Sequence, residues 1–448
     1  MKRLIFILSI SILIGQWGWA QETLSLEDAI VTALENNYGV QIAKYNTEQA
    51  EIQSHPGAAG LYPSFNLSGG GNYNLTNRTT VSGNPANPIL DPEGNPIEEF
   101  VFNESITTYG LNTAVGVAYA FGLGQLESFK ILQTNASLTK ENGLLVMEQT
   151  IAQISSTYYQ LARLTKAYQL QEASLKRSRQ RLEFAQTQRE FGTGTELAVL
   201  NARVDVSTDS INLLNANLNI ENARKDLNFL MGTEIDRRYE VNTELELNPD
   251  LNMDELETSA LSSNTSLKVA DYGRKVAELN LRVAQRARYP SVNVSGNYAY
   301  NYSTNFPFAQ TLDQATFGFA GNGSISIPIF QGNQLSRNIQ NAEVGIASSR
   351  SQYKQTEQQV IRDLQKSYAT YINNLGILRL SETSVAAAQA NFNRTKEAFE
   401  LGQSTNIAFR EAQLNLLRAE NQLNNVKFDV KSSEIDLLRL SGRLVADQ

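Results

Sequence analysis

The chain has 448 residues, 41% of them apolar and 19% charged, and its 46 acidic residues against 38 basic ones give a net charge of −8. This acidic balance argues against nucleic-acid binding, because phosphate contacts need a basic face. The sequence has no cysteine, which excludes disulfides, thiolate catalysis and Cys-based metal sites. Its single histidine, His55, is the only residue that could serve a His-dependent catalytic triad. We therefore expect no enzyme and no catalytic, metal or cofactor site.

Residues 1–20 have the features of a secretory signal. The basic pair Lys2-Arg3 precedes an apolar run over 4–14, and Gly18-Trp19-Ala20 places small residues at the two positions that flank a cleavage site. The apolar run is too short to favour a retained membrane anchor. We predict that this signal peptide is removed after export, and because no cysteine follows it, we expect no lipid anchor.

An internal repeat covers most of the remaining sequence. Residues 61–69, LYPSFNLSG, recur 227 positions later as residues 288–296, RYPSVNVSG. Later segments match at slightly smaller offsets. Agreement in the same order along both halves indicates a duplication rather than chance. It predicts a first repeat over 21–232, a connector over 233–250 and a second repeat over 251–448.

Each repeat contains two segments in which apolar and polar residues alternate, which predicts strands at about 62–76, 107–122, 289–303 and 314–330. One face of each strand is rich in Tyr and Phe, and the other is small and polar. Alternation over ten or more residues is long for a soluble strand and matches a transmembrane β-strand, with the aromatic face toward lipid. The face of a soluble β-sandwich is the alternative.

Four strands are too few to close a membrane barrel. Edge groups left unpaired in lipid cost several kcal/mol each, and the smallest closed barrels have about eight strands. A membrane assignment therefore requires at least two copies of the chain. The links at 76–106 and 303–313, the first of them rich in Asn-Pro and Asp-Pro pairs, are predicted to be exterior loops.

Long proline-free stretches predict helical hairpins over about 125–231 and 333–441. Glycine and threonine mark their turns, at Gly192-Thr193-Gly194-Thr195 and Gly402-Gln403-Ser404-Thr405. The returning helices have a seam with sustained 4,3 spacing, which predicts a coiled coil, although a dimerising rod would have the same spacing. The seam positions are Ala202, Val206, Asp209, Leu213, Ala216, Ile220, Ala223, Leu227 and Leu230, and Ala412, Leu416, Ala419, Leu423, Val426, Val430, Ser433, Leu437 and Leu440.

The order of these features resembles one family, the TolC-like outer-membrane efflux proteins, also called outer membrane factors. The features are the signal, two repeats, Tyr-Pro-Ser before a strand, Phe-x-Gly-Asn-Gln after one, and a Gly-Gln-Ser-Thr turn. The resemblance covers nearly all of the mature chain. It implies an α+β membrane protein, a homotrimer that pools four strands per chain into a 12-stranded β-barrel. A long antiparallel α-helical coiled-coil barrel would continue it through the periplasm.

The resemblance also implies a function. The trimer would be the outer-membrane channel-tunnel of a tripartite efflux or type I secretion system. It would passively conduct cargo from a periplasmic pump complex to the exterior, through the outer membrane and its lipid. Its partners would be a periplasmic adaptor, which meets the turns at 192–195 and 402–405, and an inner-membrane pump.

Members of this family narrow the periplasmic end with acidic rings on the second hairpin. The matching positions here are Ala408 and Glu411, with Phe399 just before the turn, so one of the two acids is missing. In the first repeat Asn201 corresponds to Glu411, and Glu196 lies nearby. These five residues are the candidate gate, and three Glu411 carboxylates could form a cation filter. A solvated helix face is the alternative interpretation of Glu411.

Two rival functions fit less well. A trimeric coiled-coil surface adhesin, or another structural outer-membrane protein, could combine a barrel with a helical stalk. Such adhesins usually place one barrel segment at the C-terminus, whereas the strands predicted here lie mid-chain. A soluble enzyme is disfavoured by the missing cysteine and the lone histidine.

Overall fold

A computed structural model describes residues 23–444 apart from 83–88, 91, 98–99, 249 and 307–312. The predicted signal peptide, residues 1–20, lies outside the described residues, as do parts of both predicted exterior loops. The chain divides into a helical unit and a sheet unit. The helical unit is Met1–Gln49, Ser137–Arg274 and Ser349–Gln448, and the sheet unit is Ala50–Ala136 and Lys275–Ser348.

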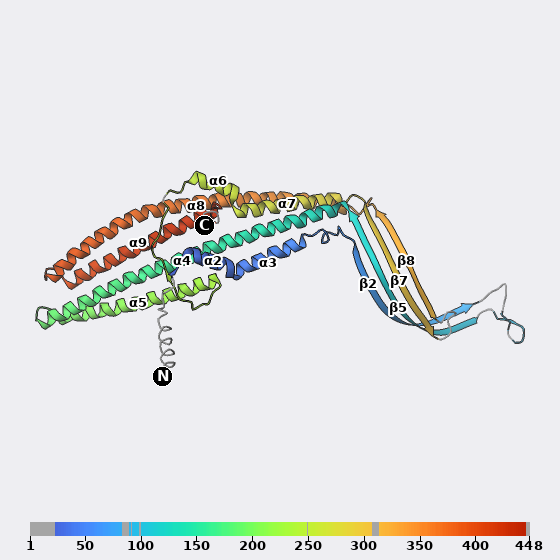
Figure 1. The fold of residues 1–448 in the computed structure, drawn as a ribbon, viewed down its shortest axis with the longest axis horizontal. Helices are drawn as coiled ribbons and strands as arrows, with labels where there is room; N and C mark the ends of the chain where they lie inside the picture. The colour runs from blue at the N-terminus through green and yellow to red at the C-terminus, as the bar shows by residue number, and fades with distance from the viewer. Residues whose placement is uncertain are drawn as a thin grey trace, which may run out of the picture. The chain divides into compact units, whose positions relative to one another are not determined.

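The sheet unit is built on four antiparallel strands in the order β2-β5-β7-β8 (Figure 1). The strands are β2 (Ser64–Ser82), β5 (Phe100–Gly122), β7 (Ser291–Phe306) and β8 (Asp313–Ser326). A small hairpin, β3 (Ile89–Leu90) with β4 (Pro96–Ile97), follows β2.

Several strand boundaries differ from the prediction. The prediction of a loop from residue 76 was wrong at both ends, because β2 and β5 stay paired from Thr76↔Ile106 to Ser82↔Phe100. The prediction that the last strand reaches about residue 330 was also wrong, since β8 ends at Ser326. Pro328 lacks the backbone N–H that a strand ladder needs, which explains the earlier end.

The strand register aligns the aromatic side chains on one face. Directly paired residues share a face, so Leu67, Val115, Tyr298 and Phe319 form one row across all four strands. This face is uncovered in the single chain, and Phe319 is 75% exposed. In the described part of the chain, β2 and β8 each pair on one side only. The sheet therefore has an unpartnered apolar face and two open edges.

The helices include two long hairpins (Figure 1). They are α4 (Leu123–Glu190) with α5 (Glu196–Met231), and α8 (Gln334–Glu400) with α9 (Asn406–Leu440). The shorter helices are α2 (Leu26–Asn36), α3 (Tyr38–Gln53), α6 (Met253–Ser263) and α7 (Thr265–Arg286). No helix within the described ranges is both long and apolar enough to cross a membrane.

The predicted 4,3 seams are the inward faces of α5 and α9. Every seam position is buried or half-buried. The helical unit has two large apolar clusters, and the fully buried Leu227 and Leu437 occupy corresponding seam positions in them. Apolar burial along one face of a helix therefore explains the repeat pattern of the sequence.

The duplication is visible in matching hydrogen bonds. The Tyr158 hydroxyl donates to the Leu24 carbonyl at 2.9 Å, and the Tyr368 hydroxyl donates to the Leu251 carbonyl at 3.3 Å. Leu24 lies near the start of the first repeat, in β1 (Thr23–Leu24). This strand pairs in parallel with β6 (Glu240–Val241), a short strand that the sequence did not predict within the connector.

A second pair of matching bonds ties each short helix junction to the end of a hairpin. The Asn37 amide donates to the Leu230 carbonyl at 2.7 Å, and the Asn264 amide donates to the Leu440 carbonyl at 2.9 Å. Both asparagines also accept bonds from backbone amides that begin the following helix. Each therefore ends one helix, caps the next and anchors the returning helix of its own repeat.

Candidate functional site

The two hairpin turns have the same backbone geometry. Gly192 and Gly402 both adopt a φ of 74°, a left-handed conformation that favours glycine. The next amides, of Thr193 and Gln403, donate to carbonyls five residues earlier at 2.9 and 2.7 Å. These bonds close the ends of α4 and α8. The turns predicted from glycine and threonine are therefore formed by local chemistry in each repeat.

Each turn ends at a threonine that caps the next helix. The Thr195 hydroxyl accepts from the Ala198 amide at 3.2 Å, and the Thr405 hydroxyl accepts from the Ala408 amide at 3.1 Å. The two turns are also joined directly, because the Asn406 side chain donates to the Ala198 carbonyl at 3.2 Å. The eight predicted turn residues thus belong to two linked hairpin ends.

Two of the candidate gate residues share a groove between α5 and α9. Glu411 and Asn201 both line this groove, which has a volume of about 670 Å³. Its walls include the exposed apolar side chains of Leu197 and Ile407. Glu411 is exposed. The groove therefore combines apolar walls with charged side chains, and Glu411 and Asn201 occupy positions in it that correspond in the two repeats. Its other charged side chains are Asp205, Arg181, Arg410 and Arg418.

The other candidate gate residues lie elsewhere. Phe399 is buried and its ring stacks on that of Phe409, with the ring centres 4.9 Å apart. Ala408 is half-buried in the first turn of α9. Glu196 is exposed and forms an ion pair with Arg189 across the first turn at 2.7 Å. The five residues thus surround the hairpin ends without forming one cluster.

A buried network of charged and polar residues, which the sequence did not predict, joins the two hairpins. Arg410 on α9 donates two hydrogen bonds of 2.8 Å to the two carboxylate oxygens of Asp209 on α5. The Ser178 hydroxyl on α4 donates to the same carboxylate at 2.5 Å. Gln413 on α9 donates to Ser178 at 2.8 Å and to the Ser174 carbonyl at 2.9 Å. Three helices therefore meet at one carboxylate.

A second ion pair balances the charge of the network. Arg181 on α4 forms an ion pair with Asp205 on α5, and the Arg410 side chain lies 3.5 Å from the same carboxylate. Two arginines and two aspartates are thus held together. Asp209 is only 1% exposed, so its charge depends on these partners rather than on water.

The titration of the network follows from burial and pairing. Burial alone would raise the pKa of Asp209, but the hydrogen bonds from Arg410 and Ser178 outweigh it and hold that pKa below the ordinary range. Burial also opposes the charge of Arg410, yet its bonds to Asp209 raise the pKa of the guanidinium. Burial lowers the pKa of Arg181. Both members of the Arg410–Asp209 pair therefore stay charged at neutral pH.

One sequence signal could have identified the network. Asp209 occupies a position in an otherwise apolar 4,3 seam, and a charge there requires a partner. The partner could not be named from the sequence, because Arg410 lies in the other repeat. The seam could therefore have indicated a buried charged group, but not the residue that pairs with it.

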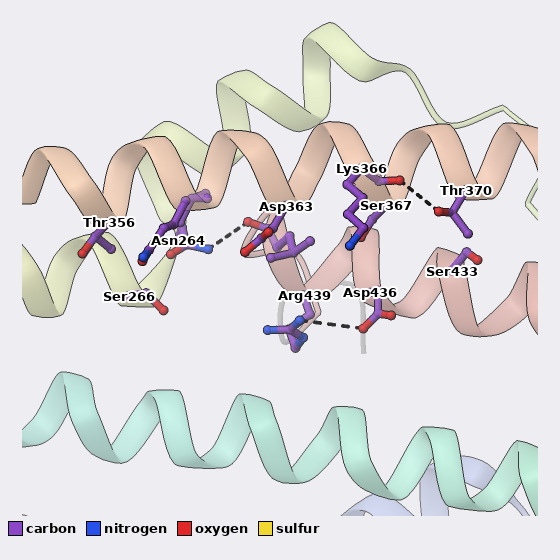
Figure 2. A pocket seen from close by; sticks show the side chains of 13 residues that line it. Asn264, Ser266, Thr356, Asp363, Lys366, Ser367, Thr370, Ser433, Asp436 and Arg439 are labelled. Carbon is purple, nitrogen blue, oxygen red and sulfur yellow. Dashed lines mark hydrogen bonds and ion pairs between the residues drawn. The ribbon is translucent and has the colours of Figure 1, made fainter.

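A second groove lies between α7, α8 and α9 and has a volume of about 480 Å³ (Figure 2). Its walls carry hydroxyl groups and four charged side chains, among them the pair Arg439–Asp436 at 3.7 Å. Asn264, which anchors the end of α9, forms one wall. No cluster of three or more His, Cys, Asp or Glu side chains suited to a metal ion occurs in the part of the chain that the structure describes. The groove is thus polar but has no metal-binding set.

Comparisons with known proteins agree with this architecture. A family model described as "Outer membrane efflux protein" matches residues 29–233 and 256–443, which covers both repeats. The "Probable efflux pump outer membrane protein TtgC" of Pseudomonas putida is 22% identical over 96% of this chain and 85% of the relative. The "Outer membrane protein TolC" of Vibrio cholerae is 25% identical over 41% of this chain and 42% of the relative.

A solved structure shares the fold over nearly the whole chain. The CmeC outer membrane channel of Campylobacter jejuni superposes with a TM-score of 0.74 at 17% identity, over 96% of this chain and 91% of that one. The family model matches well over half of the sequence, and its match divides at the connector between the repeats. The chain therefore belongs to the TolC-like family of outer membrane efflux proteins.

Proposed function

We propose that the chain is the channel subunit of an efflux system, and that it conducts cargo passively across the outer membrane without catalysing a reaction. The observation that carries this proposal is the four-stranded sheet. Its apolar face is uncovered in the single chain, and its polar face consists mostly of small residues and asparagines. A sheet of this kind suits lipid on one side and water on the other.

The open sheet edges support a homotrimer with a 12-stranded barrel. β2 and β8 have unpaired backbone groups along one side each, and in lipid such groups must find partners. Pairing β8 of one copy with β2 of the next would satisfy both edges and continue the same strand order. Three copies of four strands give twelve, which is large enough to enclose a water-filled lumen.

Exposed seams on α5 and α8 support the same assembly. The contacts between the hairpins described above involve α4, α5 and α9, and α5 and α8 each have an additional seam that is uncovered in the single chain. The α5 seam has large side chains at Leu197, Leu200, Val204, Ile211, Leu214 and Leu218. The α8 seam is mostly small, at Gly376, Leu380, Thr383, Ala387 and Ala390. Large side chains of one copy could pack against small ones of the next.

The hairpin turns are the proposed contact with a periplasmic adaptor, which would connect the channel to an inner-membrane pump. The linked turns at 192–195 and 402–405 are exposed and formed by tight local bonds. The protein would lie in the outer membrane and extend into the periplasm without a lipid anchor. Relatives named for efflux pumps support efflux over type I secretion as the main role.

The periplasmic end is the proposed gate, with Glu411 as its charged group. Three copies would place three Glu411 carboxylates in one ring, while Asn201 on the same groove has no charge. Opening would require α9 to move relative to α4 and α5, and the Arg410–Asp209 pair would oppose that movement. Gate selectivity and gate closure therefore depend on different residues.

Planar-bilayer recording tests the channel and its gate together. The wild-type protein should form cation-preferring pores, and Glu411→Gln should bring the cation-to-anion permeability ratio closer to one. Glu244→Gln is the matched control, because Glu244 is an exposed glutamate in the connector. An unchanged ratio in Glu411→Gln would reject the selectivity role, and a wild-type protein without conductance would reject the channel itself.

A further inference from the structure

Most of the paired part of the sheet contains no charged residue. Residues 64–77, 105–122, 291–304 and 314–326 include no Asp, Glu, Lys, Arg or His, although 19% of the whole chain is charged. The first charged positions occur at the loop ends of the strands, at Arg78, Glu104 and Asp313. A lumen made by these strands would therefore have no fixed charge along most of its length.

The polar face is instead rich in asparagine. The register places amide, hydroxyl and small side chains in common rows, such as Asn66, Gly116, Asn297 and Ala320. An amide side chain both donates and accepts hydrogen bonds, so it interacts with cations, anions and neutral groups alike. The asparagines on this face are Asn66, Asn72, Asn74, Asn112, Asn293, Asn297, Asn301 and Asn322.

Three of these asparagines lie over glycines of the neighbouring strand. Asn112 is directly paired with Gly70, and a Cβ atom on that glycine would lie 2.8 Å from the Asn112 Oδ1 atom. Asn66 is paired with Gly116, with a corresponding distance of 2.9 Å, and Asn72 covers Gly110 in the same way. Each amide thus occupies the space that a neighbouring side chain would need.

This arrangement keeps the asparagine side chains against the wall. Because glycine has no Cβ atom, the amide can lie along the sheet instead of standing upright from it. Any side chain at the glycine would force the amide to leave this position, since Cβ contacts below 3 Å essentially do not occur. The glycines therefore determine how far the asparagines reach from the polar face.

We propose that the strand-lined section of the conduit selects cargo by size and not by charge, with its clearance set by the three Asn–Gly pairs of β2 and β5. This inference rests on the proposed channel function, which assigns the polar face to the lumen. It implies cargo of mixed charge, limited by cross-section. Any preference for cations would then arise at the helical end of the channel, at Glu411.

Thiol labelling tests the absence of charge selection. Because the chain has no cysteine, Asn301→Cys would introduce a single thiol on the exposed polar face. The reconstituted variant is treated from the exterior side with cationic and anionic methanethiosulfonates of similar size, each rate being normalised to a free thiol. Equal normalised rates are expected. A tenfold preference for either sign would overturn the charge inference while leaving the channel intact, and no labelling by either reagent would reject the lumen assignment.

Alanine substitution tests the size inference. Gly70→Ala should lower single-channel conductance and the largest neutral polymer that enters, because its methyl group displaces the Asn112 amide. Gly318→Ala is the matched control, since it adds the same methyl group to the same face at a position with nothing within 4 Å. The double variant Gly70→Ala/Asn112→Ala should recover the wild-type values. Equal effects of Gly70→Ala and Gly318→Ala, or no recovery in the double variant, would overturn the inference.

Discussion

Replacing Arg410 by methionine would leave the Asp209 carboxylate buried between the two hairpins without its hydrogen bonds from Arg410. Asp209 has a side chain that is 2% exposed, and Arg410 supplies its two charged hydrogen bonds. Ser178 would remain as a neutral donor at 2.5 Å. Methionine has a similar length and no charge, so the substitution removes the pairing with little change in volume.

The expected loss is large for a single substitution. Removing one partner of a buried ion pair costs about 3–5 kcal/mol, because the other charge remains without compensation. The unfolding entropy is about 2.1 cal/mol/K per residue. For a chain of 448 residues the total unfolding entropy is therefore roughly 0.9 kcal/mol/K. Arg410→Met should therefore lower the unfolding midpoint by about 3–5 °C.

Thermal unfolding of the purified protein, followed by circular dichroism, measures this loss. The double variant Asp209→Leu/Arg410→Met is the control, because replacing both charges by apolar groups is often neutral or stabilising. It should recover most of the midpoint. A single variant that unfolds like wild type, or a double variant no better than the single one, would refute the assignment of Arg410 as the partner of Asp209.

The same pair makes a prediction about pH. The folded-state pKa of Asp209 is below its ordinary value of about 3.9, so its stabilising contribution is fully present above that value. The contribution is lost as the pH falls through the lower folded-state pKa. The difference in midpoint between wild type and the double variant should therefore be constant between about pH 5 and 7 and change only below about pH 4.

Two further comparisons each set one substitution against a similar one elsewhere in the chain. Gly402→Ala should cost about 1–2 kcal/mol of folding free energy through its φ of 74° alone, because nothing lies within 4 Å of its Cβ position. Gly232→Ala should cost more, since its Cβ would lie 2.7 Å from the backbone carbon of residue 36. Thermal unfolding that ranked Gly402→Ala as the more damaging change would contradict this reasoning. Tyr158→Phe should lower the midpoint more than Tyr368→Phe, because the Tyr158 hydroxyl makes bonds of 2.9 and 3.3 Å and that of Tyr368 makes one of 3.3 Å. Equal midpoints for the two tyrosine variants would argue against the second bond.

The repeating patterns were the most predictable part of the fold. Burial on one face requires a period of two in a strand and 4,3 spacing in a packed helix. The sequence therefore predicted the common face of Leu67 and Phe319 and the buried seam that includes Leu227 and Leu437. Strand ends were less predictable, because the pairing beyond Thr76 depends on the partner strand rather than on alternation.

The candidate site was predicted only in part. Local signals placed both turns correctly, since glycine and threonine act within a few residues of the chain. The buried network depends on how two distant hairpins pack, which no local pattern encodes. A solvated helix face is the alternative interpretation of Glu411, but the neighbouring Arg410 does not lie on such a face, since its side chain is only 13% exposed.

The uncovered sheet has a consequence for biogenesis. A newly exported monomer would present open strand edges beside aromatic side chains such as Phe65 and Phe317, which are 75% and 73% exposed. Edges of this kind template pairing with any available strand, and a sheet whose charges lie only near its loop ends has few charged gatekeepers to prevent it. Productive assembly therefore competes with aggregation while the protein is in the periplasm. The scarcity of charge that would suit a permissive lumen would thus make the unassembled subunit dependent on rapid pairing of its strand edges.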